Sequence, residues 1–135
     1  MEKEIRKVAC IEKDQEKNAV IELTENNDSV TIRFSLGKLV LEKEEENYFD
    51  ALIKLREELE QRNIKLLCKG CSRNVYPSGM ILSMGVGRKA YTLIYGSQAK
   101  MDSLVDIFDS CLVEEYATIE EQSEYFENWW TSLRR

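Results

Sequence analysis

Residues 29–36 alternate strictly between apolar and polar side chains, and this pattern limits the fold of the chain more than any other. Val30, Ile32, Phe34 and Leu36 fall on one face of the segment. A strand with one apolar face is typical of an antiparallel sheet that packs on a core and exposes its other side. Further strands are predicted at the neighbouring stretches, which are 4–12 (an edge strand), 19–24 and 39–42. The first forty residues therefore predict a β-meander.

Helical spacing begins directly after this meander. Asn47 is predicted to cap a helix that ends near Gln61, because apolar residues recur at helical spacing between them. Residues 101–112 show the same spacing and predict a second helix. Thr118 and Glu121 form a capping box, which predicts a C-terminal amphipathic helix. The shorter predicted elements are strands at 64–68 and 88–95 and a short helix at 79–84 that Ser78 caps.

These elements predict an α+β fold, with an antiparallel sheet packed against helices, in a single domain over residues 1–135. The predicted apolar stripe of the last helix is Ile119, Phe126, Trp130 and Leu133. Trp129 points about 100° away from Trp130 on such a helix. It is therefore either a candidate anchor for a partner or a ring folded over the edge of the core.

The overall charge excludes some classes of partner. The chain has a net charge of −6, and binding to nucleic acid depends on neutralising phosphates, so we do not expect a nucleic-acid-binding protein. No stretch approaches the roughly 18–20 apolar residues of a membrane span, and the first residues lack the apolar run of a signal peptide. We expect a cytoplasmic protein without a membrane partner, whose surface suits a basic protein.

One internal segment contrasts with this acidic composition. Residues 61–101 carry seven Lys or Arg and no Asp or Glu, so their charge is +7 while the rest of the chain is −13. Four of the six glycines and the only proline lie in its central stretch, residues 67–91. An anion or another small ligand could bind to such a connection. The candidate ligand-binding residues are Arg73, Tyr76, Ser78, Arg88 and Lys89.

The residues give little support for catalysis or metal binding. The chain has no histidine, which excludes Ser–His and Cys–His nucleophilic sites. Cys68-Lys69-Gly70-Cys71 has the spacing of a metal or redox motif, but there is no second such pair, and the segment that follows is not helical. We expect four reduced cysteines, no metal, no cofactor and no catalytic residue.

The segment Gly70-Cys71-Ser72-Arg73-Asn74-Val75-Tyr76-Pro77-Ser78-Gly79-Met80 resembles a motif of a family of small bacterial proteins. The resemblance extends over roughly residues 48–133, including Lys89-Ala90-Tyr91 and the last helix. It implies an immunity protein of a polymorphic or contact-dependent toxin system.

The leading hypothesis is therefore a non-enzymatic, immunity-type inhibitor that binds a bacterial toxin such as a nuclease, with a cognate toxin as its partner. Asp102, Asp106 and Asp109 would lie on one side of the predicted 101–112 helix, so they are candidate contacts together with Trp129. The alternative is a small-ligand or anion-binding protein, or an enzyme, that uses the basic glycine-rich segment.

Overall fold

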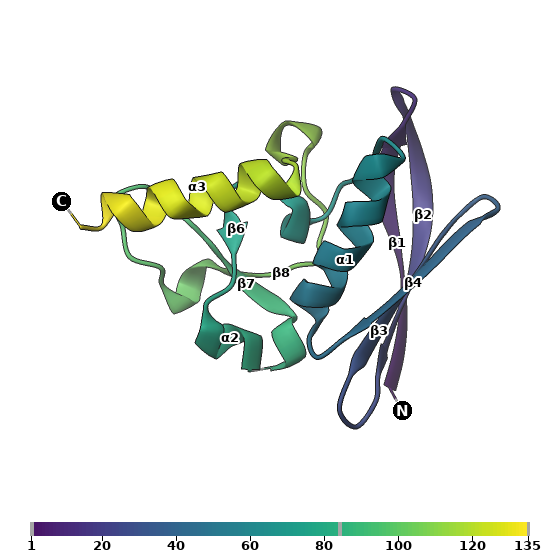
Figure 1. Ribbon diagram of the computed structural model, residues 1–135, viewed down its shortest axis with the longest axis horizontal. Helices are drawn as coiled ribbons and strands as arrows, with labels where there is room; N and C mark the ends of the chain where they lie inside the picture. The colour runs from purple at the N-terminus through teal and green to yellow at the C-terminus, as the bar shows by residue number, and fades with distance from the viewer. Residues whose placement is uncertain (1, 84, 135) are drawn as a thin grey trace.

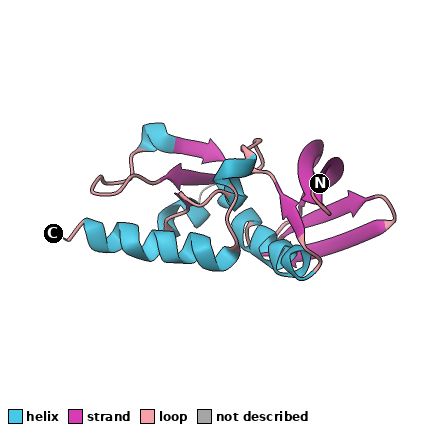
Figure 2. Cartoon of the chain, turned by 90° about the horizontal axis from the view of Figure 1, so that it is seen from above, coloured by secondary structure: helices cyan, strands magenta, loops and turns pink. Residues whose placement is uncertain are grey.

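The structure is a computed structural model that describes residues 2–83 and 85–134, and it contains two antiparallel sheets and three α-helices (Figure 1). The larger sheet has the strand order β4-β3-β2-β1-β5, and the smaller sheet has the order β6-β7-β8. α1 and α3 lie along one side of the molecule (Figure 2). The α+β class that the sequence predicts is confirmed.

The predicted β-meander forms the larger sheet. Its strands are β1 (Glu2–Glu12), β2 (Gln15–Glu25), β3 (Val30–Leu36) and β4 (Leu39–Glu45). Lys13 and Asp14 connect β1 to β2 with φ angles of 54° and 60°, which are values that a two-residue hairpin turn requires. The apolar face of β3 is buried at Val30, Ile32 and Phe34. The apolar–polar alternation of this segment therefore predicted correctly which side of the sheet faces the core.

α1 (Tyr48–Gln61) packs against this sheet and begins at the predicted cap. The Asn47 side chain accepts a hydrogen bond from the Asp50 amide at 2.8 Å, which satisfies one of the free amides of the first turn. The helix buries Leu52, Leu55 and Leu59 in the larger hydrophobic core. β5 (Ile64–Leu66) follows and pairs with the end of β1.

The glycine-rich connection forms several short elements. They are the 3₁₀ turn η1 (Lys69–Cys71), β6 (Val75–Tyr76), α2 (Gly79–Ser83), the 3₁₀ turn η2 (Gly85–Gly87) and β7 (Lys89–Thr92). The Ser78 hydroxyl accepts a hydrogen bond from the Ile81 amide at 3.1 Å, so the predicted cap of α2 is confirmed. Gly85 has a φ of +59°, a left-handed conformation that ends this helix with little strain. Met84, which the sequence places in the helix, lies outside the described residues.

The predicted helix at 101–112 is wrong. This segment forms a 3₁₀ turn, η3 (Met101–Ser103), and then β8 (Leu104–Asp106), which pairs with β7. The Asp106 carboxylate accepts a hydrogen bond from the Phe108 amide at 2.9 Å. A side chain that bonds the backbone locally in this way competes with the helical ladder. Another 3₁₀ turn, η4 (Val113–Glu115), leads to the last helix.

α3 (Ile119–Ser132) has the predicted capping box, in which Thr118 and Glu121 exchange hydrogen bonds of 2.9 and 3.1 Å. Its buried face is rotated from the predicted one. Trp129 is 6% exposed and Trp130 is 46% exposed, so the prediction that Trp130 belongs to the buried stripe is wrong. The Trp129 ring packs with Ile81, Tyr91 and Leu93 in a second, smaller core. None of the described helices is long and apolar enough to cross a membrane.

Candidate functional site

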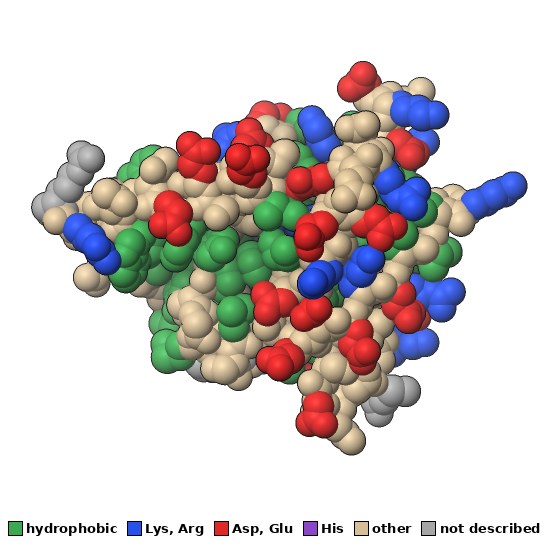
Figure 3. Space-filling model, viewed as in Figure 1, with side chains coloured by type: hydrophobic (Ala, Val, Ile, Leu, Met, Phe, Trp, Pro, Cys, Tyr) green, Lys and Arg blue, Asp and Glu red, His purple; other side chains and the backbone are tan. Residues whose placement is uncertain are grey.

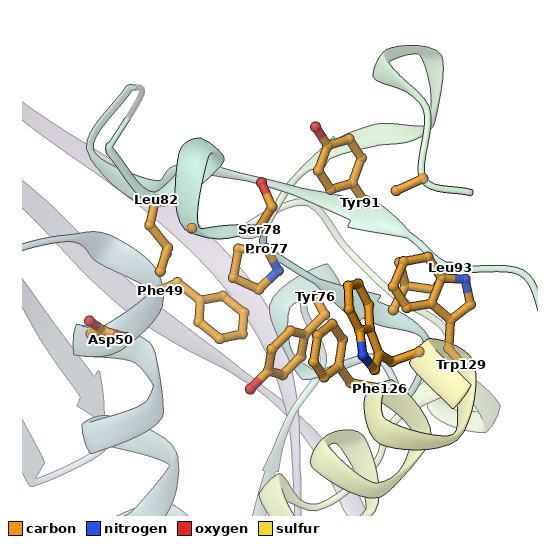
Figure 4. A pocket seen from close by; sticks show the side chains of 13 residues that line it. Phe49, Asp50, Tyr76, Pro77, Ser78, Leu82, Tyr91, Leu93, Phe126 and Trp129 are labelled. Carbon is orange, nitrogen blue, oxygen red and sulfur yellow. The ribbon is translucent and has the colours of Figure 1, made fainter. Parts of the chain in front are cut away.

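A pocket lined mainly by aromatic side chains lies between the start of α1, the β6–α2 connection, β7 and the second half of α3 (Figure 4). Its volume is about 450 Å³, which is within the usual range for small-ligand sites. The larger residues that line it are Phe49, Tyr76, Leu82, Tyr91, Leu93, Phe126, Trp129 and Trp130. The pocket is therefore suited to an apolar group.

Contacts between the rings hold the pocket walls in place. The Tyr76 ring stacks on Phe126 with a centroid distance of 4.3 Å, and its edge meets Phe49 at 5.5 Å. The Trp129 indole N–H donates a hydrogen bond to the Ser97 carbonyl at 2.9 Å. Because each ring is fixed by a neighbour, a bound apolar group would meet a preformed surface.

Polar groups are few and lie at the rim. The Ser78 hydroxyl already caps α2, and the exposed Asp50 carboxylate accepts a hydrogen bond from the Asn47 side chain. Burial raises the pKa of the Tyr76 phenol, and the negative charges of Glu127 and Asp50 raise it further. These carboxylates thus lie close enough to act on the pocket wall. None of the described residues that line the pocket is a Lys or Arg.

An acidic groove adjoins this pocket on the other side of α3, where α3 faces α1. The part of its lining that the structure describes includes five glutamates and no Lys or Arg. Among the described residues, none of the five forms an ion pair. Figure 3 shows acidic side chains along α1 and α3, with hydrophobic side chains gathered below α3 on the same face. The glutamates are Glu57, Glu60, Glu120, Glu124 and Glu127. We call this set the glutamate groove.

The aspartates predicted as partner contacts do not share one helical face. Asp102 lies exposed in the η3 turn. Asp106 and Asp109 form ion pairs with Arg6 at 3.5 and 3.0 Å, and Asp106 also pairs with Arg88 at 3.1 Å. Two of the three charges are therefore neutralised locally. The geometry that grouped them came from the predicted helix, which β8 replaces.

The five predicted ligand-binding residues are also separated. Tyr76 and Ser78 line the aromatic pocket, whereas Arg73, Arg88 and Lys89 are absent from its lining. Arg88 is paired with Glu4 and Asp106, and Arg73 lies 3.8 Å from a Glu121 oxygen. Lys89 is exposed on β7. Carboxylates from distant parts of the chain thus approach the basic segment, and its arginines are not assembled into one anion site.

The described residues contain no group of three or more His, Cys, Asp or Glu side chains arranged to hold a metal ion. The sequence did not identify Phe49 and Phe126 as pocket walls, and it did not identify the glutamate groove. The concentration of aromatic residues in the last twenty positions was a signal for the pocket, whereas the groove requires the packing of α1 beside α3.

No protein-family model matches this chain, and no curated protein matches it either.

Proposed function

We propose that the chain is a non-enzymatic protein-binding module of the immunity type, which binds a basic region of a bacterial toxin. The observation that carries the proposal is the glutamate groove beside an aromatic pocket. The resemblance of residues 70–80 to a bacterial family supports the same class of partner.

The charge of the groove favours a basic partner. Carboxylates that form no ion pair within their own chain are available to attract Lys and Arg on another protein. This attraction accelerates association at low ionic strength and is screened over about 8–10 Å under physiological conditions. A nuclease, whose active site binds phosphates, would present a suitable basic surface. The proposed contact surface is therefore the glutamate groove, in place of the three aspartates.

The aromatic pocket would add binding affinity that a purely ionic surface lacks. Exposed ion pairs contribute little affinity, whereas an apolar side chain that enters a preformed pocket can contribute several kcal/mol. Glu127 acts on the Tyr76 phenol in the pocket wall and also lines the groove. A single partner segment could thus place an apolar side chain in the pocket while its Lys or Arg residues contact the groove.

Charge reversal in the groove tests this proposal. Glu120, Glu124 and Glu127 are changed together to Lys, and growth is measured in bacteria that express a candidate toxin domain chosen from the genes beside the one for this chain. We expect loss of protection, and slower association of the purified proteins that depends less on salt. The matched control reverses Glu16 and Glu42, which are exposed on strands of the larger sheet, and Asp28, which is exposed in the turn between β2 and β3.

Equal protection by the groove variant and the control variant would show that the groove is not the contact surface. Loss of protection by an Asp102→Lys, Asp109→Lys variant alone would instead favour the surface predicted from the sequence. If the unchanged protein inhibits no such toxin, the immunity function itself is wrong. Circular dichroism confirms that each variant is folded before it is compared.

The mainly apolar lining of the aromatic pocket favours a second candidate, the binding of a small apolar ligand. Calorimetric titration with indole tests the pocket, and titration with inorganic phosphate tests the anion site predicted from the sequence. Binding of indole that is lost in Phe126→Ala would support this candidate. Binding of phosphate that is lost in Arg73→Ala would support the basic segment instead.

A further inference from the structure

A second cluster of reactive groups lies inside the molecule, away from the pocket and the groove. Cys68 precedes the η1 turn and Cys71 is its last residue, and the Cys71 amide donates a hydrogen bond to the Cys68 carbonyl at 2.8 Å. Both side chains are 0% exposed, and their sulfur atoms are 3.7 Å apart. The turn therefore places the two thiols in direct contact.

A buried guanidinium lies beside them. Arg56 of α1 is 2% exposed. Its two terminal nitrogens donate hydrogen bonds to the Gly70 and Ala117 carbonyls and to the Gln122 side-chain oxygen, at 3.1, 2.9 and 2.6 Å. All three acceptors are neutral. The Nε atom is buried without a hydrogen-bond partner, and Arg56 forms no ion pair within the described part of the chain.

Such an arrangement is costly unless an anion lies nearby, since a buried charge without a counter-charge is strongly destabilising. A Cys71 thiolate would be such an anion at the buried end of this cluster, and the Glu60 carboxylate, one turn along α1, adds a further negative charge that acts on Cys71. Burial by itself raises the pKa of the Cys71 thiol, but the hydrogen bond from Cys68 and the positive charge of Arg56 bring it below its ordinary value. The hydrogen bond to Cys71 raises the pKa of Cys68, and burial raises it further, so Cys68 keeps its proton.

We propose that Cys68 and Cys71 form a peroxide-reactive dithiol, in which Cys71 is oxidised first and Cys68 then closes an intramolecular disulfide. The Cys71 thiolate attacks one oxygen of hydrogen peroxide and breaks the O–O bond, which gives a sulfenic acid and hydroxide, and the hydroxide takes a proton from solvent to become water. The Cys68 sulfur then attacks the Cys71 sulfur and displaces hydroxide, which leaves as water with the Cys68 proton. The dithiol loses two electrons, and the peroxide is reduced to two waters.

The other cysteines provide internal controls. Cys111 is 9% exposed, and burial raises the pKa of its thiol to about 11. Cys10 is 0% exposed, and burial raises the pKa of its thiol as well. If access alone set the order of oxidation, Cys111 would react first. If the thiolate beside Arg56 sets it, Cys71 reacts first although it is less exposed.

The experiment treats the full chain with limiting hydrogen peroxide, alkylates the remaining thiols after unfolding, and identifies them by mass spectrometry. We expect the Cys68–Cys71 disulfide to form while Cys10 and Cys111 remain reduced. In Cys68→Ser, which removes the second sulfur, we expect Cys71 to gain oxygen instead of forming a disulfide. Cys111→Ser should leave the wild-type reaction unchanged.

Oxidation of Cys111 or Cys10 before Cys71, or at the same rate, would overturn the proposal. So would a Cys68–Cys71 pair that stays reduced while Cys111 is oxidised. The order of cysteine oxidation is measured on the wild-type protein, so a variant that fails to fold does not affect the conclusion. The outcome is also independent of the toxin-binding proposal, because it requires no partner.

Discussion

The substitution Gln122→Met tests the buried polar network that joins α3 to the turn around Gly70. Gln122 is 1% exposed. Its side-chain nitrogen donates to the carbonyls of Gly70, Ser72 and Val75 at 2.9, 2.8 and 2.9 Å, and its oxygen accepts from Arg56 at 2.6 Å. Methionine has a similar shape but can make none of these bonds.

The size of the effect follows from this geometry. The amide has two N–H groups for three carbonyls, so we count two neutral hydrogen bonds and one with a charged donor. Neutral bonds contribute about 0.5–1.5 kcal/mol each, and a bond to a charged group contributes about 1.5–3 kcal/mol. Because methionine fills most of the volume, the cavity term is small. We expect the free energy of unfolding to fall by about 2.5–6 kcal/mol.

Urea unfolding followed by circular dichroism measures this loss as a lower midpoint with an unchanged slope. Gln61→Met is the control, since Gln61 is an exposed residue of α1, and we expect a change within about 0.5 kcal/mol. A loss below about 1 kcal/mol for Gln122→Met would refute the reasoning, because the carbonyls and Arg56 would then have other partners.

Two further predictions concern helix ends. Ser78→Ala removes the side chain that caps α2, and we expect a loss of about 0.5–2 kcal/mol; an unchanged denaturant midpoint would contradict this. The Thr118 amide donates to the Glu121 carboxylate, and this bond lowers the pKa of Glu121. Because the folded-state pKa lies below the unfolded value, Glu121 contributes stability at neutral pH that is lost on acidification below about pH 4. Between neutral pH and the range below about pH 4, the free energy of unfolding should fall less in Glu121→Gln than in the wild-type protein. Parallel pH profiles of the two proteins would show that the Glu121 carboxylate does not contribute to stability.

Local patterns predicted much of the fold because their causes lie within a few residues. The alternation in β3 and the caps at Asn47, Ser78 and Thr118 all appear in the structure where the sequence places them. The 101–112 segment has equally regular apolar spacing. It became a turn and a strand because β7 offers an edge for pairing and an aspartate side chain bonds the local backbone.

The candidate sites were less predictable, since each one joins distant segments. The aromatic pocket combines α1, β6, β7 and α3, and the glutamate groove requires α3 to lie beside α1. The motif Cys68-Lys69-Gly70-Cys71 is visible in the sequence, but the guanidinium that makes it a candidate reactive site comes from α1. No local sequence pattern predicts that Arg56 lies beside this motif.

The sequence by itself determined the β-meander, the starts of α1, α2 and α3, and the segregation of positive charge into residues 61–101. Tertiary structure alone decided that Trp129 and not Trp130 is buried, and that Glu4 and Asp106 neutralise Arg88. It also placed Gln122 against Arg56, 66 residues away along the chain. The physical reason is range: capping and alternation act between near neighbours, whereas burial and charge pairing depend on which faces of distant elements meet.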